Sequence, residues 1–228
     1  MKFAIGIWLI LAAFAQATNL EFAEITKDIN AAADATTVIA EFTFTNKSDK
    51  TVTITKSDSG CSCLKVEIAD GKLKYAPGES GVVRTQFEMG NVSGVVDKIV
   101  ALWLDNDPAE QPSLQLTLRI HVPVLIALAP KTLTWELGAP LEPKTIEIRM
   151  AEGQSIRVTS VTTSSELYVC ELKTLEEGKK YDLRVTPKPM ETPGMCVIRI
   201  ETDCPITKQR VQQAFAVVRR PLPSTVKP

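Results

Sequence analysis

The sequence has very little histidine: His121 is the only one in 228 residues. Histidine-based triads, multi-histidine zinc sites and most general-base mechanisms need that residue in the right place, so these classes are disfavoured. The sequence also has no glycine-rich phosphate loop, no nucleophile elbow and no paired zinc motif. We therefore expect a protein that is not an enzyme, and no residue supports a hydrolase.

The sequence also has no excess of positive or negative charge. The chain has 26 lysine and arginine residues against 27 aspartate and glutamate residues, and the two signs are interspersed. A nucleic-acid or anionic-membrane surface needs a basic patch, so neither partner is expected. We expect other envelope or extracellular proteins as partners.

Long apolar runs are absent after the first residues. Phe3 to Phe14 is apolar throughout but shorter than the ~20 residues that a spanning helix needs. Lys2 precedes this run, and Ala15-Gln16-Ala17 fits the small-x-small rule for cleavage after Ala17. The sequence therefore predicts a signal peptide over residues 1–17, with an uncleaved anchor as the alternative. The predicted mature chain is periplasmic or secreted and has no membrane span.

The rest of the sequence alternates apolar and polar residues, and no segment sustains an apolar period of 3.6. Val38, Ala40, Phe42 and Phe44 share one face of a predicted strand, and the residues between them share the other. Ala31–Ala33 is the one place that permits a helical turn. Short strands separated by turns, about seven in the first half, are typical of an immunoglobulin-like sandwich.

The predicted fold class is all-β, with two tandem immunoglobulin-like β-sandwich domains. Landmarks recur at matching positions of the two halves: Gly94 and Gly194 each open a strand, and Gly78 and Gly178 each precede one. We infer a tandem repeat, joined near Pro123–Pro130. The predicted bounds are a signal peptide at 1–17, a first sandwich at 18–124, a second at 125–220 and a flexible tail at 221–228.

Cys61 and Cys63 stand one residue apart at the end of a predicted strand. If the strand continued, their Cα atoms would be ~6.5–7 Å apart, at or beyond the limit for a disulfide. Three interpretations stay open. The thiols are packed or one is bridged elsewhere; they form a strained, readily reduced disulfide at a bend; or they bind a soft metal ion such as copper(I), with Met89 or His121 as a candidate further ligand.

The first half resembles a bacterial exported family known as domain of unknown function 1573, which is similar to the immunoglobulin-like domains of the abnormal-spindle and Hydin group. The resemblance covers roughly Ala40 to Val122 and implies an exported immunoglobulin-like domain with no assigned activity. The family motif usually reads Ser-Cys-Gly-Cys-Thr, and here Ser62 and Leu64 stand in place of its glycine and threonine. The matching residues are Phe42-Thr43-Phe44-Thr45-Asn46, Val52-Thr53-Ile54, Cys61 and Cys63, Pro77-Gly78-Glu79, Phe87, Gly94 and Asn106-Asp107.

The chain has five cysteines, an odd number, so at least one has no internal disulfide partner. Cys170 and Cys196 each lie on an apolar face of a predicted strand and are expected to face the core. A disulfide between them would cross the core like the inter-sheet bond of antibody domains. Burial as free thiols is the alternative. Cys204, at a turn, is expected to be unpaired.

Other polar motifs have ordinary structural explanations. His121 ends a strand and is expected at the surface, whereas Trp103 and Trp135 are expected in the core. Asn46 begins a glycosylation sequon, which matters only in a eukaryotic secretory pathway. Asp105–Asp107 is an acidic turn, and turn chemistry explains it without calcium.

These observations favour a noncatalytic exported protein that acts as a binding or scaffolding module in the cell envelope. It would act through loops at the sandwich ends or through exposed edge strands. No cofactor is expected for such a module. The alternative is a thiol-redox or copper(I)-handling protein that uses Cys61 and Cys63.

Overall fold

The computed structural model describes residues 19–221, which form two compact units built almost entirely of strands. The predicted signal peptide, and the predicted tail beyond Pro221, lie outside the described residues. Within the described part of the chain, no helix is long and apolar enough to cross a membrane. The expected all-β fold class is confirmed.

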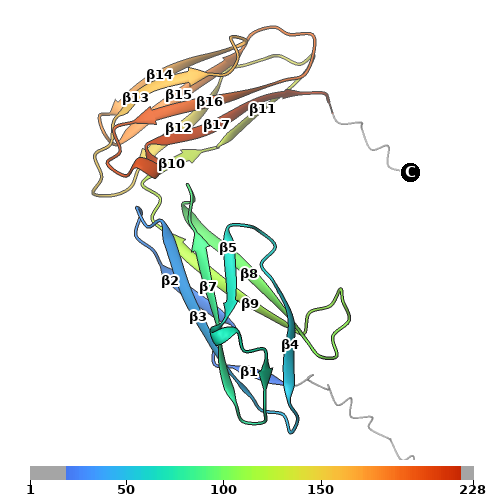
Figure 1. The fold of residues 1–228 in the computed structure, drawn as a ribbon. Coiled ribbons are helices and arrows are strands. Elements are labelled where there is room, and N and C mark those ends of the chain that lie inside the picture. The colour runs from blue at the N-terminus through green and yellow to red at the C-terminus, as the bar shows by residue number, and fades with distance from the viewer. Residues whose placement is uncertain (1–18, 222–228) are drawn as a thin grey trace, which may run out of the picture. The chain divides into compact units, whose positions relative to one another are not determined.

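The first nine strands form two sheets that contain no later strand (Figure 1). They are β1 (Leu20–Phe22), β2 (Thr26–Asn30), β3 (Thr37–Asn46), β4 (Val52–Asp58), β5 (Leu64–Ile68), β6 (Lys74–Tyr75), β7 (Ser80–Glu88), β8 (Gly94–Leu104) and β9 (Leu114–Val122). One sheet has the order β1-β3-β7-β5, and the other has the order β2-β9-β8-β4-β6. A short 3-10 helix, η1 (Ala69–Gly71), connects β5 to β6.

The alternating pattern of β3 explains its place in the first sandwich. Val38, Ala40, Phe42 and Phe44 are all buried, and the residues between them are exposed. Burial of each large apolar side chain contributes ~1.5–3 kcal/mol. The face predicted from the period of two is therefore the face that packs against the second sheet.

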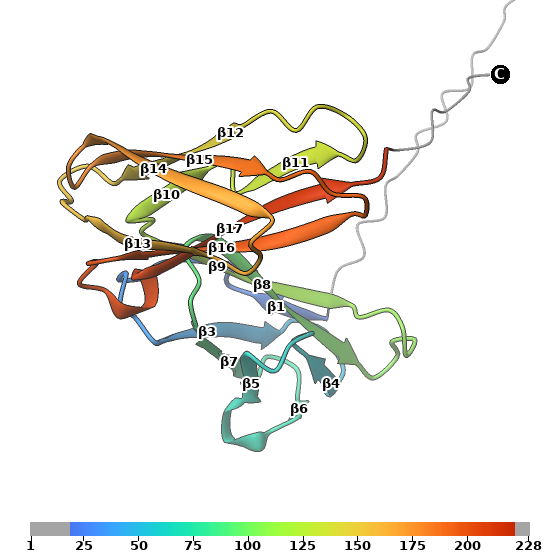
Figure 2. The same cartoon turned by 90° about the horizontal axis from the view of Figure 1, so that it is seen from above.

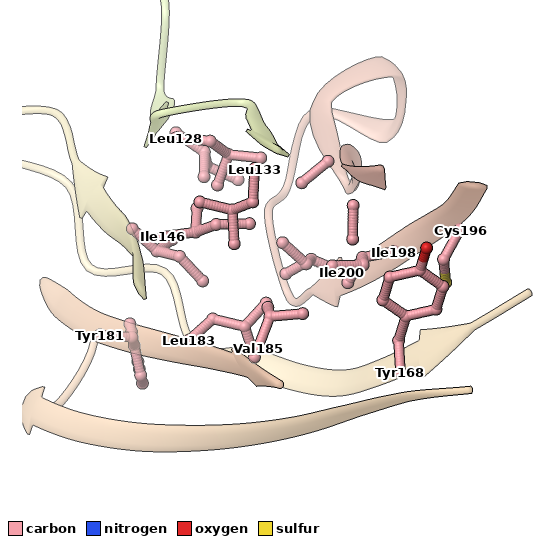
Figure 3. Close-up of a cluster of buried hydrophobic side chains, with 14 of the residues drawn as sticks. Leu128, Leu133, Ile146, Tyr168, Tyr181, Leu183, Val185, Cys196, Ile198 and Ile200 are labelled. Carbon is pink, nitrogen blue, oxygen red and sulfur yellow. The ribbon is translucent and has the colours of Figure 1, made fainter. Parts of the chain in front are cut away.

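The remaining strands form a second sandwich with its own core (Figure 2). They are β10 (Ile126–Ala129), β11 (Thr132–Glu136), β12 (Lys144–Met150), β13 (Val158–Thr163), β14 (Tyr168–Glu176), β15 (Lys180–Pro187), β16 (Gly194–Thr202) and β17 (Val211–Arg219), with the 3-10 helix η2 (Thr207–Gln209) between the last two. The sheets have the orders β10-β12-β15-β14 and β11-β17-β16-β13. Ile146, Leu183, Ile198 and Ile200 project between the two sheets and are fully buried (Figure 3).

The two sandwiches repeat one topology. In the first, the sheet order β1-β3-β7-β5 places the first, third, seventh and fifth strands side by side. In the second sandwich, the order β10-β12-β15-β14 places the first, third, sixth and fifth strands side by side. The order is the same as in the first sandwich, because the second has no strand that matches β6 and every later strand is numbered one lower. These are the sheets of an immunoglobulin-like domain, so the predicted fold of two tandem sandwiches is confirmed.

The structure differs from the predicted elements in three places. The first sandwich has nine strands instead of about seven, because β1 and β2 divide one edge segment between two sheets and β6 is an extra short strand. The predicted junction at Pro123–Pro130 contains β10, which pairs with β12. Ala31–Ala33 forms no helix; Ala35 N donates to Ala32 O at 3.1 Å in a turn.

Candidate functional site

The Cys61–Cys63 motif lies in a turn between β4 and β5, not on a continued strand. β4 ends at Asp58, and Gly60 turns the chain with a φ of 66°, a conformation that glycine adopts without steric cost. The bend brings the two cysteine Cα atoms to 5.3 Å, and the side chains form a disulfide. The strand therefore does not continue through the motif, and the bend that a disulfide needs is present.

Hydrogen bonds from neighbouring residues hold this turn. Gly60 N donates to Asp58 Oδ1 at 2.8 Å, and Ser59 Oγ donates to Cys61 O at 2.9 Å. Leu64, the first residue of β5, is buried and anchors the chain after the disulfide. The turn is therefore ordered by local polar contacts on one side and by the core on the other.

The disulfide is partly open to solvent, because Cys61 and Cys63 are both half-buried. A disulfide offers no thiolate, so the pair in this state is not a copper(I) ligand set. Among residues 19–221 no three histidine, cysteine or acidic side chains are grouped as a metal site. His121 instead lies 2.9 Å from Asp28, measured from Nε2 to Oδ1, and Met89 is fully buried.

The predicted disulfide between Cys170 and Cys196 is not formed; both are free thiols, as is Cys204. Cys196 is fully buried on β16, whereas Cys170 is half-buried on β14 in the opposite sheet. Burial, and to a lesser degree the neighbouring Cys196, raise the pKa of Cys170 to about 11. The raised pKa lowers the thiolate fraction of Cys170 below that of an ordinary cysteine, and the thiolate is the form that reacts in thiol chemistry. Cys204 is also fully buried.

A hollow with a volume of about 640 Å³ lies at one end of the first sandwich. Its lining combines Asn19, the start of β4 with the two residues before it, and two parts of the connection between β8 and β9, residues 104–108 and 111–113. The acidic turn predicted at Asp105–Asp107 forms part of this wall. Because β4 separates the hollow from the Cys61–Cys63 turn along the chain, the two features lie at opposite ends of that strand.

Both aspartates of the acidic turn fix the wall of the hollow. Asp105 Oδ2 accepts a hydrogen bond from Thr53 N at 2.6 Å. Asp107 Oδ2 accepts from Leu104 N at 2.8 Å and from Ser113 N at 2.9 Å, and its Oδ1 accepts from the Ser113 hydroxyl. Burial raises the pKa of Asp107, but these hydrogen bonds outweigh it, so the net shift is downward. The expected turn chemistry is thus observed.

Other predicted residues take structural positions. Trp103 and Trp135 are buried, and Trp135 Nε1 donates to Glu142 O at 2.7 Å. Asn46 is fully buried at the end of β3, where its side chain binds the backbone of the following turn and of β6. A glycosylating enzyme needs the Asn46 amide exposed, so the sequon is not usable in the folded protein.

The comparisons with known proteins find one family model that matches the first sandwich. Residues 20–120 match the model of a family described as "Protein of unknown function (DUF1573)". The resemblance of the first half is thereby confirmed. The DUF1573 match covers β1 to β9 as far as Ile120 and includes none of the second sandwich. DUF1573 is not a known catalytic family. No curated protein matches the chain.

Several solved structures resemble the chain at low sequence identity. A protein of unknown function from Porphyromonas gingivalis W83 is 12% identical, with 88% of this chain and 99% of that chain covered and a TM-score of 0.36. The PapD-like domain 7 of human CEP192 is 9% identical, with 54% and 97% covered and a TM-score of 0.37. The YadV chaperone is 8% identical, with 88% and 100% covered and a TM-score of 0.33.

Proposed function

We propose that the protein is a noncatalytic exported module that binds other envelope proteins through the loop end of its first sandwich. The observation that carries this proposal is the hollow between the start of β4 and the β8–β9 connection. Export is supported by the predicted signal peptide at residues 1–17. Loops at the ends of immunoglobulin-like sandwiches are a common position for binding surfaces.

The hollow is suited to binding because its walls are fixed before a partner arrives. Asp105 and Asp107 hold the backbone of the turn through hydrogen bonds, so little ordering entropy remains to be lost on association. Lys50, Asn106 and Gln111 are exposed at the hollow and carry side chains that donate hydrogen bonds. The surface therefore fits a polar protein segment with backbone carbonyl or carboxylate acceptors.

Filling the hollow is expected to weaken partner binding. Gln111→Trp removes the amide donor and places a bulkier side chain in the hollow, and we expect at least a tenfold loss of partner recovered from an envelope fraction. Glu110→Trp is the matched control, because Glu110 is exposed and adjacent but does not line the hollow. Quantitative mass spectrometry of material bound to each immobilised variant measures the difference. Equal recovery by the wild type and both variants would rule out this hollow as the binding site.

A second candidate function rests on the accessible disulfide. An external thiolate that attacks Cys61 or Cys63 would form a mixed disulfide and release the other sulfur as a thiolate. A second thiol of the reductant would then resolve the mixed disulfide, so that the reductant leaves oxidised and the pair becomes a dithiol. In that reduced state the pair offers the two soft ligands that copper(I) prefers.

The Cys61→Ser, Cys63→Ser double variant separates a functional pair from a structural one. Cross-linking two residues in so short a loop removes little chain entropy, so the variant is expected to lose about 1.5 kcal/mol of unfolding free energy. Denaturation of the oxidised wild type and the variant measures this loss. Thiol exchange is supported if a dithiol opens the wild-type pair in the native protein and copper(I) then binds to the wild type alone. If the folded wild type resists reduction, the pair is a structural cross-link.

A further inference from the structure

β14 is an edge strand that carries exposed apolar side chains. It ends its sheet and pairs with β15 along nearly its whole length; no strand of residues 19–221 pairs with its other edge (Figure 1). Val169 is 43% exposed, Leu172 39% and Leu175 47%. Natural edge strands are usually shortened, charged or covered against pairing. This nine-residue edge carries charge at Glu171, Lys173 and Glu176, but it is not shortened, and three apolar side chains stay exposed along it.

The register identifies which backbone groups the free edge presents. Lys188 N donates to Leu167 O at 2.7 Å, and the same antiparallel register continues to Lys173 opposite Asp182. Hydrogen-bonded pairs alternate along an antiparallel ladder, so the odd-numbered residues of β14 bond to β15. Cys170, Leu172 and Thr174 consequently direct their N–H and C=O groups toward the free edge.

The sequence of this edge is complementary to itself. Around Leu172 it reads Val169-Cys170-Glu171-Leu172-Lys173-Thr174-Leu175. The residues on either side of Leu172 are oppositely charged, the next two are small, and the outermost two are apolar. In an antiparallel copy centred on Leu172, each charged residue therefore lies opposite a residue of the other sign, and each outer apolar residue lies opposite an apolar residue.

We propose that β14 is the docking surface for a second copy of this chain, which adds its own β14 antiparallel with the two Leu172 residues opposite each other. The free N–H and C=O groups of Cys170, Leu172 and Thr174 bond to those of the partner's β14. On the outer face, Glu171 lies opposite the partner's Lys173, and Lys173 opposite the partner's Glu171. Opposite-charge cross-strand pairs stabilise such a ladder, and like charges destabilise it.

The outer apolar residues extend the same interface. Val169 lies opposite the partner's Leu175 at both ends of the paired segment, which is the diad symmetry of an isologous dimer. The ladder with β15 shifts register between Thr174 and Glu176, so the regular part of β14 ends at Thr174 and the contacts between Val169 and the partner's Leu175 lie at the margins of the paired segment. The result is one continuous sheet formed from β10-β12-β15-β14 of both chains.

Charge reversal tests the register directly. Glu171→Lys places lysine opposite the partner's Lys173 twice, and Lys173→Glu places glutamate opposite the partner's Glu171 twice. Each variant alone is expected to stay monomeric at concentrations where the wild-type protein is a dimer by sedimentation velocity. A mixture of the two variants restores both opposite-charge pairs, so it is expected to form a heterodimer.

Two further variants make the result decisive. Lys65→Glu lies on β5, the strand at the same place in the first sandwich, and is expected to leave the dimer unchanged. Thr174→Pro removes an N–H that points to the partner and not to β15, so it is expected to weaken dimerisation at least tenfold without loss of the native β signal. A wild type that sediments as a monomer at all concentrations overturns the proposal. So does a dimer that survives both charge reversals, or a mixture of the two variants that stays monomeric.

Discussion

Asn46→Asp is expected to destabilise the first sandwich more than Asn46→Ala at pH 7. The Asn46 Nδ2 atom donates to Lys50 O at 2.7 Å and to Tyr75 O at 2.8 Å, while Oδ1 accepts from Ser48 N at 3.0 Å. Alanine leaves these buried groups unpaired, at a cost of about 2–3 kcal/mol. Aspartate instead turns a buried anionic oxygen toward two carbonyl oxygens, and we expect a loss of about 3–5 kcal/mol.

The difference between the two variants should depend on pH. Burial and the two facing carbonyls favour the protonated carboxyl, so the pKa of the aspartate introduced at position 46 is higher in the folded state than its unfolded value of ~3.9. The folded state then binds more protons than the unfolded state between these two pKa values, and stability falls as the pH rises through that window. Below both pKa values the carboxyl group is protonated in the folded and the unfolded state, so the cost of burying its charge is absent.

Urea denaturation of the wild type and both variants between pH 4 and pH 8 checks this. The unfolding free energy of the aspartate variant, taken relative to the wild type, should improve toward acid pH, while that of the alanine variant should stay nearly flat. Ser48→Ala is a milder control, because it removes one hydroxyl and leaves the bonds to Lys50 and Tyr75. A flat profile for Asn46→Asp would show that its carboxylate reaches water, contrary to the burial seen here.

Much of the fold could be predicted because alternation is a local signal. The period of two in β3 specifies which side chains face the core, and the structure buries the residues that this period selects. The Cys61–Cys63 turn could not be predicted in the same way. Its geometry depends on where β4 stops, and the stop depends on Asp58 and Gly60 adopting a turn that competes with continued pairing.

The candidate site was less predictable than the fold because distant segments form it. Asp107 was recognisable as a turn residue, but the hollow also needs Asn19 and the residues around Thr51. The β4–β8 pairing brings those segments to one end of the sandwich, with Ile54 opposite Leu104. Likewise, the sequence predicts a strand at β14 but not that this strand lies at an edge, since strand order is a property of the whole sheet.

Among the glycines of residues 19–221, Gly81 in β7 is the one whose replacement should have the largest packing effect. A Cβ atom at this position would lie 2.5 Å from Phe44 Cζ and 2.5 Å from Tyr75 Cε1. Both rings are almost fully buried and pack edge to face with their centroids 4.8 Å apart, so neither can move away freely. The φ of Gly81 is not positive, so its backbone conformation does not require glycine. Glycine is needed here because the two rings leave no room for a side chain.

Gly81→Ala is expected to lower the unfolding free energy by about 2–3 kcal/mol, because the added methyl group overpacks the core. Gly194→Ala is the matched control: it is also in a strand without positive φ, and its Cβ would meet Tyr168 Oη at 3.4 Å, an ordinary contact. We expect the control to change stability by less than about 1 kcal/mol.

Phe44→Leu provides the decisive partner variant, since it removes the ring atom that the new methyl group would strike. In a double-mutant cycle by urea denaturation, Gly81→Ala should cost less in the Phe44→Leu background, with a coupling of about 1 kcal/mol or more. An additive cycle would show that the cost at Gly81 does not arise from contact with Phe44. A Gly81→Ala protein as stable as the wild type would show that the two rings can rearrange around the added methyl group, contrary to the tight packing inferred from their contacts.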